Sequence, residues 1–187
     1  MTNADFESAV HEHQGMVYSI AFHFFHNAAI AEEVAQEVFL KLFENRRAVE
    51  AGPHCVAWLR RTTAHRCIDT LRRASFRQEV QMEDLPEVAV AATESDPLLQ
   101  EGLRRLIASL PDKPRAVLVL RYGEDLDPEE IGRTLQMPVR TVWSHLQRAT
   151  ALIREKAARY RMEMEDEPNR TRPSRGIASE GSASGLR

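Results

Sequence analysis

Two prolines ten residues apart, Pro128 and Pro138, constrain the fold of this chain more than any other feature of its sequence. Asp127 precedes the first proline and Glu130 follows it, which is the pattern of a helix capping box. Pro138 has no amide hydrogen, so it favours the start of another helix after a turn of only two residues. The spacing therefore predicts a short helix that ends near Leu135, followed at once by a second helix that crosses it.

The second of these helices is basic, although the whole chain has a formal net charge of −3. Residues 138–161 hold six Lys or Arg side chains against one acid, Glu155. Apolar residues fall on one face, and the outward residues of the N-terminal half are Arg140, Thr141, Ser144, His145 and Arg148. Such side chains pair with base edges and phosphates in the major groove, so we predict a DNA-binding helix-turn-helix. An ordinary basic helix on a solvated face is the alternative.

A second basic segment lies earlier in the chain, where residues 51–73 hold five Arg side chains against one acid, Asp69. Helical spacing from Trp58 to Arg73 places Arg61, His65 and Arg72 broadly along one side, with Thr62 and Arg66 beside them. The candidate nucleic-acid contacts are Arg61, Thr62, His65 and Arg66. A plain solvated helix explains this segment equally well when it is taken alone. Together, however, the two basic segments indicate two contacts with a polyanion.

Apolar residues recur at helical spacing in two stretches of the chain, and no segment requires a β-strand. We therefore predict an all-α fold made of two small helical domains. Residues 5–73 form a three-helix domain, and residues 97–161 form a four-helix domain that contains the helix-turn-helix. Residues 74–96 are acidic and are predicted to be a flexible linker, and residues 162–187 are predicted to be a disordered tail.

Several other classes of protein are disfavoured by the sequence. Cys55 and Cys67 form no CxxC pair, and no apolar run approaches the roughly 18 residues of a membrane span. His23 and His26 would bind zinc only if another element supplied further ligands. No phosphate-binding loop, nucleophile elbow or carboxylate pair stands out. We expect a cytoplasmic protein that is not inserted in a membrane, is not an enzyme, and uses neither a metal nor another cofactor.

Three segments, in their order along the chain, resemble the bacterial extracytoplasmic-function sigma factors of RNA polymerase. They are AEEVAQEVFLKLF at 31–43, WLRRTTAHRCIDTLRR at 58–73, and LPDKPRAVLVLRYGEDLDPEEIGRTLQMPVRTVWSHLQRA at 110–149. The likeness covers about residues 5–160. It implies a promoter-specificity subunit for transcription initiation, built from sigma domains two and four without the domain that separates them in larger sigma factors.

The resemblance also implies partners and roles. Core RNA polymerase would bind through its β′ clamp helices to the second helix, at Glu32, Glu33, Gln36, Glu37 and Lys41. The four candidates on the third helix would meet the minus-ten element of promoter DNA, and the helix-turn-helix would read the minus-35 element. The second domain would also meet the β flap, and an anti-sigma factor is an implied partner. The acidic linker would be either a nucleic-acid mimic or a plain spacer.

Three positions depart from the pattern of the family that the chain resembles. His65 stands where Asn is usual, Trp143 where Lys or Arg is common, and His145 where Arg is frequent. Promoter preference therefore does not carry over from the resemblance. The remaining alternative is a helix-turn-helix repressor, which would dimerise and bind a two-fold operator without polymerase.

Overall fold

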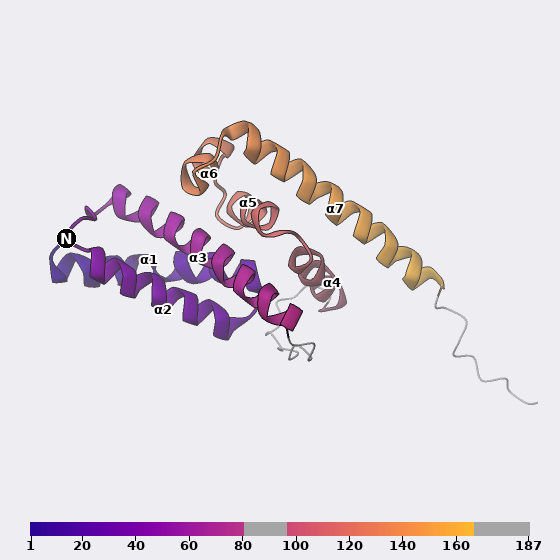
Figure 1. Ribbon diagram of the computed structural model, residues 1–187, viewed down its shortest axis with the longest axis horizontal. Helices are drawn as coiled ribbons and strands as arrows, with labels where there is room; N and C mark the ends of the chain where they lie inside the picture. The colour runs from indigo at the N-terminus through magenta and orange to yellow at the C-terminus, as the bar shows by residue number, and fades with distance from the viewer. Residues whose placement is uncertain (81–96, 167–187) are drawn as a thin grey trace, which may run out of the picture.

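The computed structural model describes residues 1–80 and 97–166, and this described part of the chain is built of helices without a strand. The first helical unit contains α1 (Asn3–Phe25), α2 (Ala28–Asn45) and α3 (Pro53–Val80). The second helical unit contains α4 (Pro97–Ala108), α5 (Asp112–Tyr122), α6 (Pro128–Leu135) and α7 (Val139–Asp166). In Figure 1 the second unit lies along α3, and the end of α7 projects away from the rest. The predicted all-α fold is confirmed.

Short capping sequences set the reversal between the first two helices. Thr2 Oγ1 accepts a hydrogen bond from the Asp5 amide at 3.1 Å, and the Asp5 carboxylate accepts one from the Thr2 amide at 2.7 Å. His26 ends α1 in the left-handed conformation, with φ of 51°. Asn27 then caps α2 by accepting from the Ile30 amide at 3.1 Å. Helices α1 and α2 are therefore joined by only His26 and Asn27, and they pack against each other.

Two helices are longer than their sequence patterns indicated. Helix α3 continues to Val80 instead of ending at Arg73, and α7 continues to Asp166 instead of ending near Arg161. The rest of the predicted linker and tail, residues 81–96 and 167–187, lies outside the described residues. Because a helical residue rises about 1.5 Å and an extended one about 3.3 Å, the seven added residues of α3 shorten the maximum reach of the connection by about 13 Å.

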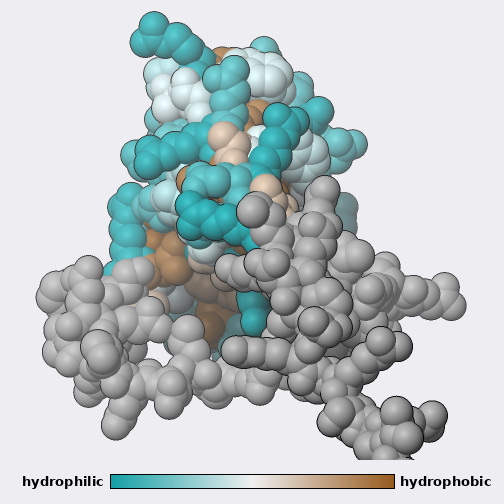
Figure 2. Space-filling view, turned by 90° about the vertical axis from the view of Figure 1, so that its right-hand side faces the viewer, coloured by the Kyte–Doolittle hydropathy of each residue, from teal (hydrophilic) through white to brown (hydrophobic). Residues whose placement is uncertain are grey.

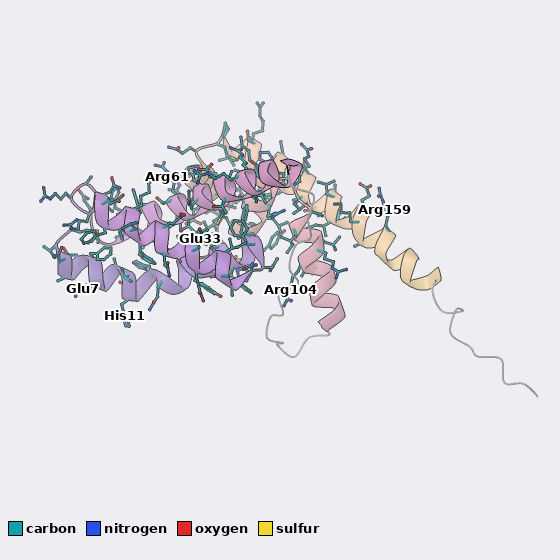
Figure 3. All side chains as sticks on the ribbon, turned by 60° about the horizontal axis from the view of Figure 1, so that its bottom comes forward. Glu7, His11, Glu33, Arg61, Arg104 and Arg159 are labelled. Atoms are coloured by element: carbon teal, nitrogen blue, oxygen red, sulfur yellow. The ribbon has the colours of Figure 1, made fainter. Side chains whose placement is uncertain are left out.

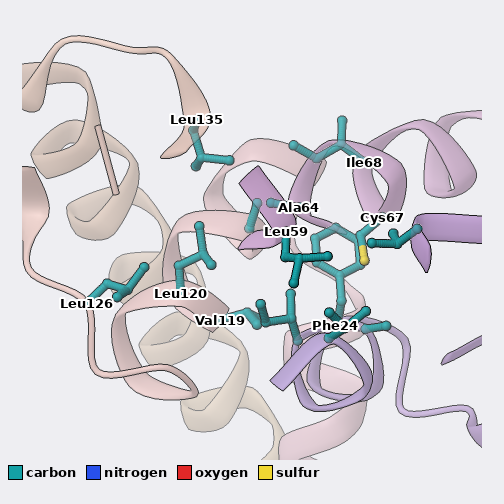
Figure 4. Close-up of a cluster of buried hydrophobic side chains, with 14 of the residues drawn as sticks. Phe24, Leu59, Ala64, Cys67, Ile68, Val119, Leu120, Leu126 and Leu135 are labelled. Atoms are coloured by element: carbon teal, nitrogen blue, oxygen red, sulfur yellow. The ribbon is translucent and has the colours of Figure 1, made fainter. Parts of the chain in front are cut away.

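The two units share one continuous hydrophobic core, although the sequence suggested two separate ones. Phe24 and Leu59 of the first unit are buried in the same cluster as Val119, Leu120 and Leu126 of the second. Figure 4 shows these side chains converging between the helices of the two units. By contrast, the described side chains on the face seen in Figure 2 are mostly hydrophilic, and hydrophobic ones show mainly in recesses. The apolar surface is thus buried between the two helical units.

Both cysteines are free thiols inside the first unit. Cys55 and Cys67 are buried, with 1% and 0% of their surfaces exposed. Burial raises the pKa of the Cys67 thiol to about 12, and burial together with Glu12 raises the pKa of the Cys55 thiol. The reactive thiolate is therefore disfavoured at both positions, and the two residues act as core side chains.

The turn between α6 and α7 depends on a glycine. Gln136 ends α6 in the left-handed conformation, with φ of 52°, and the Met137 amide donates to the Gly132 carbonyl at 2.9 Å. A Cβ atom on Gly132 would lie only 2.9 Å from the Met137 carbonyl oxygen, which belongs to the backbone and cannot rotate away. The chain can reverse this tightly because residue 132 has no side chain.

We predict that Gly132→Ala lowers the stability of the protein, although alanine favours helices more than glycine does. The backbone of the turn must shift to relieve the clash, at a cost of about 1–3 kcal/mol. The midpoint of thermal unfolding, followed by circular dichroism at 222 nm, measures the effect.

Gly15→Ala in α1 is the matched control, because a Cβ at residue 15 meets nothing within 4 Å. There alanine should stabilise the helix by up to about 1 kcal/mol, which raises the midpoint by roughly 2–4 °C in a chain of this size. A midpoint that rose equally in both variants would show that the turn tolerates a side chain.

Candidate nucleic-acid interface

The capping box predicted at the start of α6 is present. Asp127 Oδ1 accepts from the Glu130 amide at 2.7 Å, and Glu130 Oε2 accepts from the Asp127 amide at 2.9 Å. Leu126 before the cap and Ile131 after it, the positions of a hydrophobic staple, are 4% and 0% exposed. Pro138 immediately precedes α7, and its carbonyl accepts from the Thr141 amide at 2.8 Å. The cap and the turn together fix the angle at which α7 leaves the unit.

One side of helix α7 is buried against the rest of the second unit, and the other side is exposed to solvent. Val142, Leu146 and Ala149 lie in the interior. Of the five predicted DNA-binding residues, Arg140, Ser144 and Arg148 are exposed, and Thr141 and His145 are half-buried. All five precede the projecting end of the helix, where Arg159 lies (Figure 3). The surface therefore offers two cationic side chains and three hydrogen-bonding groups within nine residues of one helix.

Two details qualify this surface. The Ser144 hydroxyl donates to the Arg140 carbonyl at 3.0 Å, so its oxygen lone pairs are what it offers to an incoming donor. Trp143 is 53% exposed and lies between the polar residues. A large exposed aromatic ring among cations is suited to contact with a sugar or a base, or with an apolar protein surface.

The four candidates on α3 lie in one groove of about 590 Å³ between α2 and α3. Its lining residues are Glu37, Val38, Leu40, Lys41, Glu44, Asn45, Trp58, Arg61, Thr62, His65, Arg66 and Asp69. The groove thus combines all the predicted minus-ten residues with two of the predicted polymerase-binding residues, Glu37 and Lys41. An aromatic ring beside cations and hydrogen-bonding groups is the chemistry that holds an unstacked base.

An ion pair joins the two sets of predicted residues. Arg66 donates through Nε and Nη2 to the two carboxylate oxygens of Glu37, in a bidentate arrangement. Both side chains are partly buried, with 26% of Arg66 and 37% of Glu37 exposed. This contact could not be predicted from the sequence, because the two residues are 29 positions apart. Arg66 is therefore held in place by α2, whereas Arg61 beside it is exposed.

The two histidines that depart from the family pattern are less basic than a free imidazole. Burial is the main cause for both, and it lowers the pKa of His65 and of His145. Arg61 and Lys41 add to the effect at His65, where Asp69 opposes it, while Lys113 and Arg148 add to it at His145, where Asp112 opposes it. Both shifts favour the neutral form of the ring, in which each can donate one hydrogen bond and accept another.

The predicted polymerase-binding residues occupy the outer side of α2. Glu32, Glu33, Gln36 and Lys41 are exposed, and Glu37 is half-buried by its pairing with α3. Figure 3 shows Glu33 on α2 and Arg61 on the neighbouring helix α3. Two exposed apolar side chains, Leu40 at 60% and Phe43 at 40%, lie on the same helix and were missed by the sequence analysis. An apolar contact within a charged surface is typical of a protein-binding face.

A buried arginine was also missed. Arg115 of α5 is only 5% exposed, donates to the Leu110 carbonyl at 3.0 Å, and lies 5.3 Å from the centre of the Phe24 ring. Burial lowers the pKa of its guanidinium, and Asp112 partly opposes that shift. The apolar residues around Arg115 in the sequence predict an ordinary amphipathic helix. They do not indicate that the arginine itself is buried.

The described residues include no group of three or more His, Cys, Asp or Glu side chains placed to hold a metal ion. His23 instead shares a hydrogen bond of 3.2 Å with Ser19 one turn earlier in α1. Within the same part of the chain, no helix combines the length and the apolar character needed to cross a membrane.

The two helical units correspond to two known protein families. Residues 9–77 match Sigma-70 region 2, and residues 100–153 match Sigma-70, region 4. The fold resembles that of the sigma factor RpoE from Bartonella quintana, solved in complex with the anti-sigma factor NepR. The TM-score is 0.67 over 82% of this chain and 97% of that one, at 17% identity. The two regions together define a bacterial transcription factor of the sigma type.

Relatives narrow this class. The chain is 31% identical to the ECF RNA polymerase sigma factor SigE of Mycolicibacterium smegmatis over 84% of its own length, and it spans 63% of that relative. It is 28% identical to SigW of Bacillus subtilis, of which it spans 87%, and 30% identical to CarQ of Myxococcus xanthus, of which it spans 74%. The chain belongs to the extracytoplasmic-function sigma factors of RNA polymerase.

We predict that Glu37 and Arg66 stabilise the first unit jointly. Glu37→Ala and Arg66→Ala should each lower the free energy of unfolding, but the double variant should lose about 1 kcal/mol less than the sum, because either single change already breaks the pair. Urea unfolding of the four proteins measures this coupling.

The control is the pair Glu155 and Arg159 on α7, which are four residues apart and both more than half exposed. Its coupling should reach only a few tenths of a kcal/mol. Strictly additive losses at Glu37 and Arg66 would contradict a bidentate pair that holds α2 against α3.

Proposed function

We propose that this protein binds core RNA polymerase and directs it to promoters that carry paired minus-ten and minus-35 elements. The observation that carries the proposal is the presence in one chain of two differently built surfaces that are each suited to DNA. The α2–α3 groove offers an aromatic ring and polar groups for an unstacked base, whereas α7 offers a convex cationic face for a major groove. Family membership supports the order proposed for the two surfaces on the promoter.

In the α2–α3 groove, Arg61 is the exposed cation and is proposed to contact the DNA backbone. His65 and Thr62 are half-buried in the groove wall, where a neutral imidazole and a hydroxyl can pair with the edge of a flipped base. Arg66 is proposed to act mainly through its pair with Glu37, which shapes the groove.

On the second unit, α7 is proposed to read the minus-35 element. Arg140 stands in the first turn, where a recognition helix meets base edges, and Arg148 lies two turns later, where phosphates are nearer. Thr141, Ser144 and His145 complete the surface between them. The same unit is proposed to meet the β flap of the polymerase.

Helix α2 is proposed to bind the β′ clamp helices through its outer carboxylates, Gln36 and Lys41, with Leu40 and Phe43 as apolar anchors. The structural relative RpoE is bound by an anti-sigma factor, and we propose a partner of that class for this protein too. The protein is proposed to act in the cytoplasm as a non-catalytic subunit without a cofactor.

The deciding experiment is run-off transcription on fragmented bacterial genomic DNA, with core polymerase in the presence and absence of the protein. We expect new transcription starts that share two upstream motifs, because each DNA-reading surface selects one element. No new starts, together with tight binding of duplex DNA by the protein alone, would instead identify a helix-turn-helix repressor.

We predict that Arg140→Ala weakens initiation at those promoters about tenfold or more, because one good contact to a base contributes about 1–3 kcal/mol. Binding to core polymerase, measured by fluorescence anisotropy, should stay unchanged. Arg154→Ala is the matched control, since Arg154 is an exposed arginine further along the same helix. Equal losses in the two variants, or a parallel loss of polymerase binding, would show that the DNA-reading face of α7 is wrongly assigned.

A further inference from the structure

A second cavity, of about 870 Å³, lies where α1, α3 and α6 meet. Its walls come from residues 12–13 of α1, from residues between 52 and 61 at the start of α3, and from residues between 126 and 134 at α6. Cavities that bind small molecules are commonly about 300–1,000 Å³ and are frequent where domains meet. This α1–α3–α6 cavity is therefore of the size that holds one small molecule.

Three arginines line the cavity: Arg60 and Arg61 from α3, and Arg133 from α6. Arg61 and Arg133 are exposed, and neither makes a hydrogen bond or an ion pair with any residue that the structure describes. The Nε atom of Arg60 is buried without a hydrogen-bond partner in the same part of the chain, although the Arg60 charge partly offsets the effect of burial on the pKa of Glu124. The cavity is thus lined by guanidinium groups whose donors are still free for an anion.

Two histidines add hydrogen-bond donors to the same cavity. The His54 Nδ1 atom accepts from the Glu50 amide at 3.2 Å, so a neutral His54 ring carries its hydrogen on Nε2. His13 is half-buried, and its Nε2 atom lies 3.9 Å from the Glu12 carboxylate. Because a phosphate group offers more acceptor oxygens than a carboxylate does, phosphate is the anion that this set of donors suits best.

Another part of the cavity wall is apolar and includes an indole ring. Trp58 is half-buried, Leu126 is 4% exposed, and Pro53, Val56 and Ala57 lie in the first turns of α3. Aromatic rings and guanidinium groups stack on the flat faces of nucleobases. The cavity therefore offers a surface for a flat ring beside its donors for phosphate.

Two carboxylates on the wall narrow the choice of ligand. Glu130 uses Oε2 for the capping box of α6, which leaves Oε1, and the Glu12 side chain is 74% exposed. A carboxylate repels a phosphate, but it accepts hydrogen bonds from the amino group of a base. Cations, an aromatic ring and carboxylates together match a molecule that carries phosphate, a flat ring and N–H groups.

We propose that the α1–α3–α6 cavity binds a purine nucleotide, with its phosphates at Arg60, Arg61 and Arg133 and its base against Trp58. The nucleotide touches both helical units, because α3 supplies two of the arginines and α6 supplies the third. It is a small-molecule ligand of this protein in addition to DNA and polymerase.

The nucleotide competes with promoter DNA, because two residues are common to both sites. Trp58 and Arg61 line the α1–α3–α6 cavity and also the α2–α3 groove. A nucleotide that holds these two side chains makes them unavailable to the minus-ten element. This consequence rests on the proposed function, which assigns Arg61 to the DNA backbone, whereas the nucleotide site itself rests on the cavity alone.

Isothermal titration calorimetry with GDP and with ADP tests the site. We expect each to bind once per chain, and we expect Arg133→Ala to weaken binding at least tenfold because a charge-assisted contact to phosphate is lost. Arg154→Ala is the matched control, since Arg154 is an exposed arginine of α7 outside the cavity, and it should bind within twofold of the unchanged protein. Both variants should unfold at the same temperature as the unchanged protein when no nucleotide is present. Absence of binding by GDP and ADP overturns the site.

Guanosine and inorganic pyrophosphate separate the two halves of the ligand. Each should bind at least tenfold more weakly than GDP, because guanosine lacks the phosphates and pyrophosphate lacks the ring. Pyrophosphate that binds as tightly as GDP would overturn the nucleotide in favour of a simple anion. Guanosine that binds as tightly as GDP would overturn the role of the arginines.

Tryptophan fluorescence locates the base. The chain has two tryptophans, so Trp143→Phe leaves Trp58 as the only emitter, and Trp58→Phe leaves Trp143. GDP should quench the emission of the Trp143→Phe protein and leave that of the Trp58→Phe protein unchanged. Unchanged emission from Trp143→Phe at a GDP concentration that saturates the calorimetric signal would show that the base lies elsewhere.

Competition is measured with a labelled single-stranded minus-ten oligonucleotide, taken from a start site mapped by run-off transcription. Saturating GDP should weaken its binding at least fivefold in the unchanged protein and less than twofold in Arg133→Ala at the same GDP concentration. Equal weakening in both proteins would overturn competition through the shared residues. If no protein binds the oligonucleotide and no new transcription starts appear, the promoter function fails, and the calorimetry still decides the nucleotide site.

Discussion

The packing of α3 against two different neighbours is the constraint on which the rest of the structure depends. One side of this helix buries Leu59 and Cys67 in the first unit, and another side carries Ala64 and Ile68 toward the second unit. The remaining side of α3 is exposed to solvent, and Arg61 lies there. The same helix therefore completes a core, holds the second unit and lines the candidate minus-ten groove, so a change on any side of it affects the other two.

Electrostatics divide the arginines of the protein into two kinds. Arg66, Arg72 and Arg115 are committed to Glu37, to Asp112, and to backbone carbonyls beside Phe24. They orient helices through these partners, although the Arg72 side chain is still 56% exposed. Arg61 and Arg140 are exposed. Since screening weakens exposed charges in a protein but phosphate binding releases counterions, we propose that these exposed arginines act in DNA binding more than in stability.

The sequence was most informative where structure is local. The Asp127 cap, the two prolines and the basic face of α7 all act within a few residues of themselves, so the helix-turn-helix could be predicted with its outward residues. It could not reveal that Arg66 pairs with Glu37, because a contact across 29 positions has no periodic signature. The need for glycine at position 132 could not be predicted from the sequence either, because it arises from the Met137 carbonyl in the next turn.

The junction between the units was also beyond sequence reasoning, and for a different reason. Ala64 and Ile68 fit the amphipathic pattern of an ordinary helix, and an acidic connection after α3 suggested separated domains. Nothing in a 3.6-residue period distinguishes a helix with one buried side from a helix with two adjacent buried sides. The ion pair between Arg72 and Asp112, which are 40 positions apart, shows that the second side has a partner.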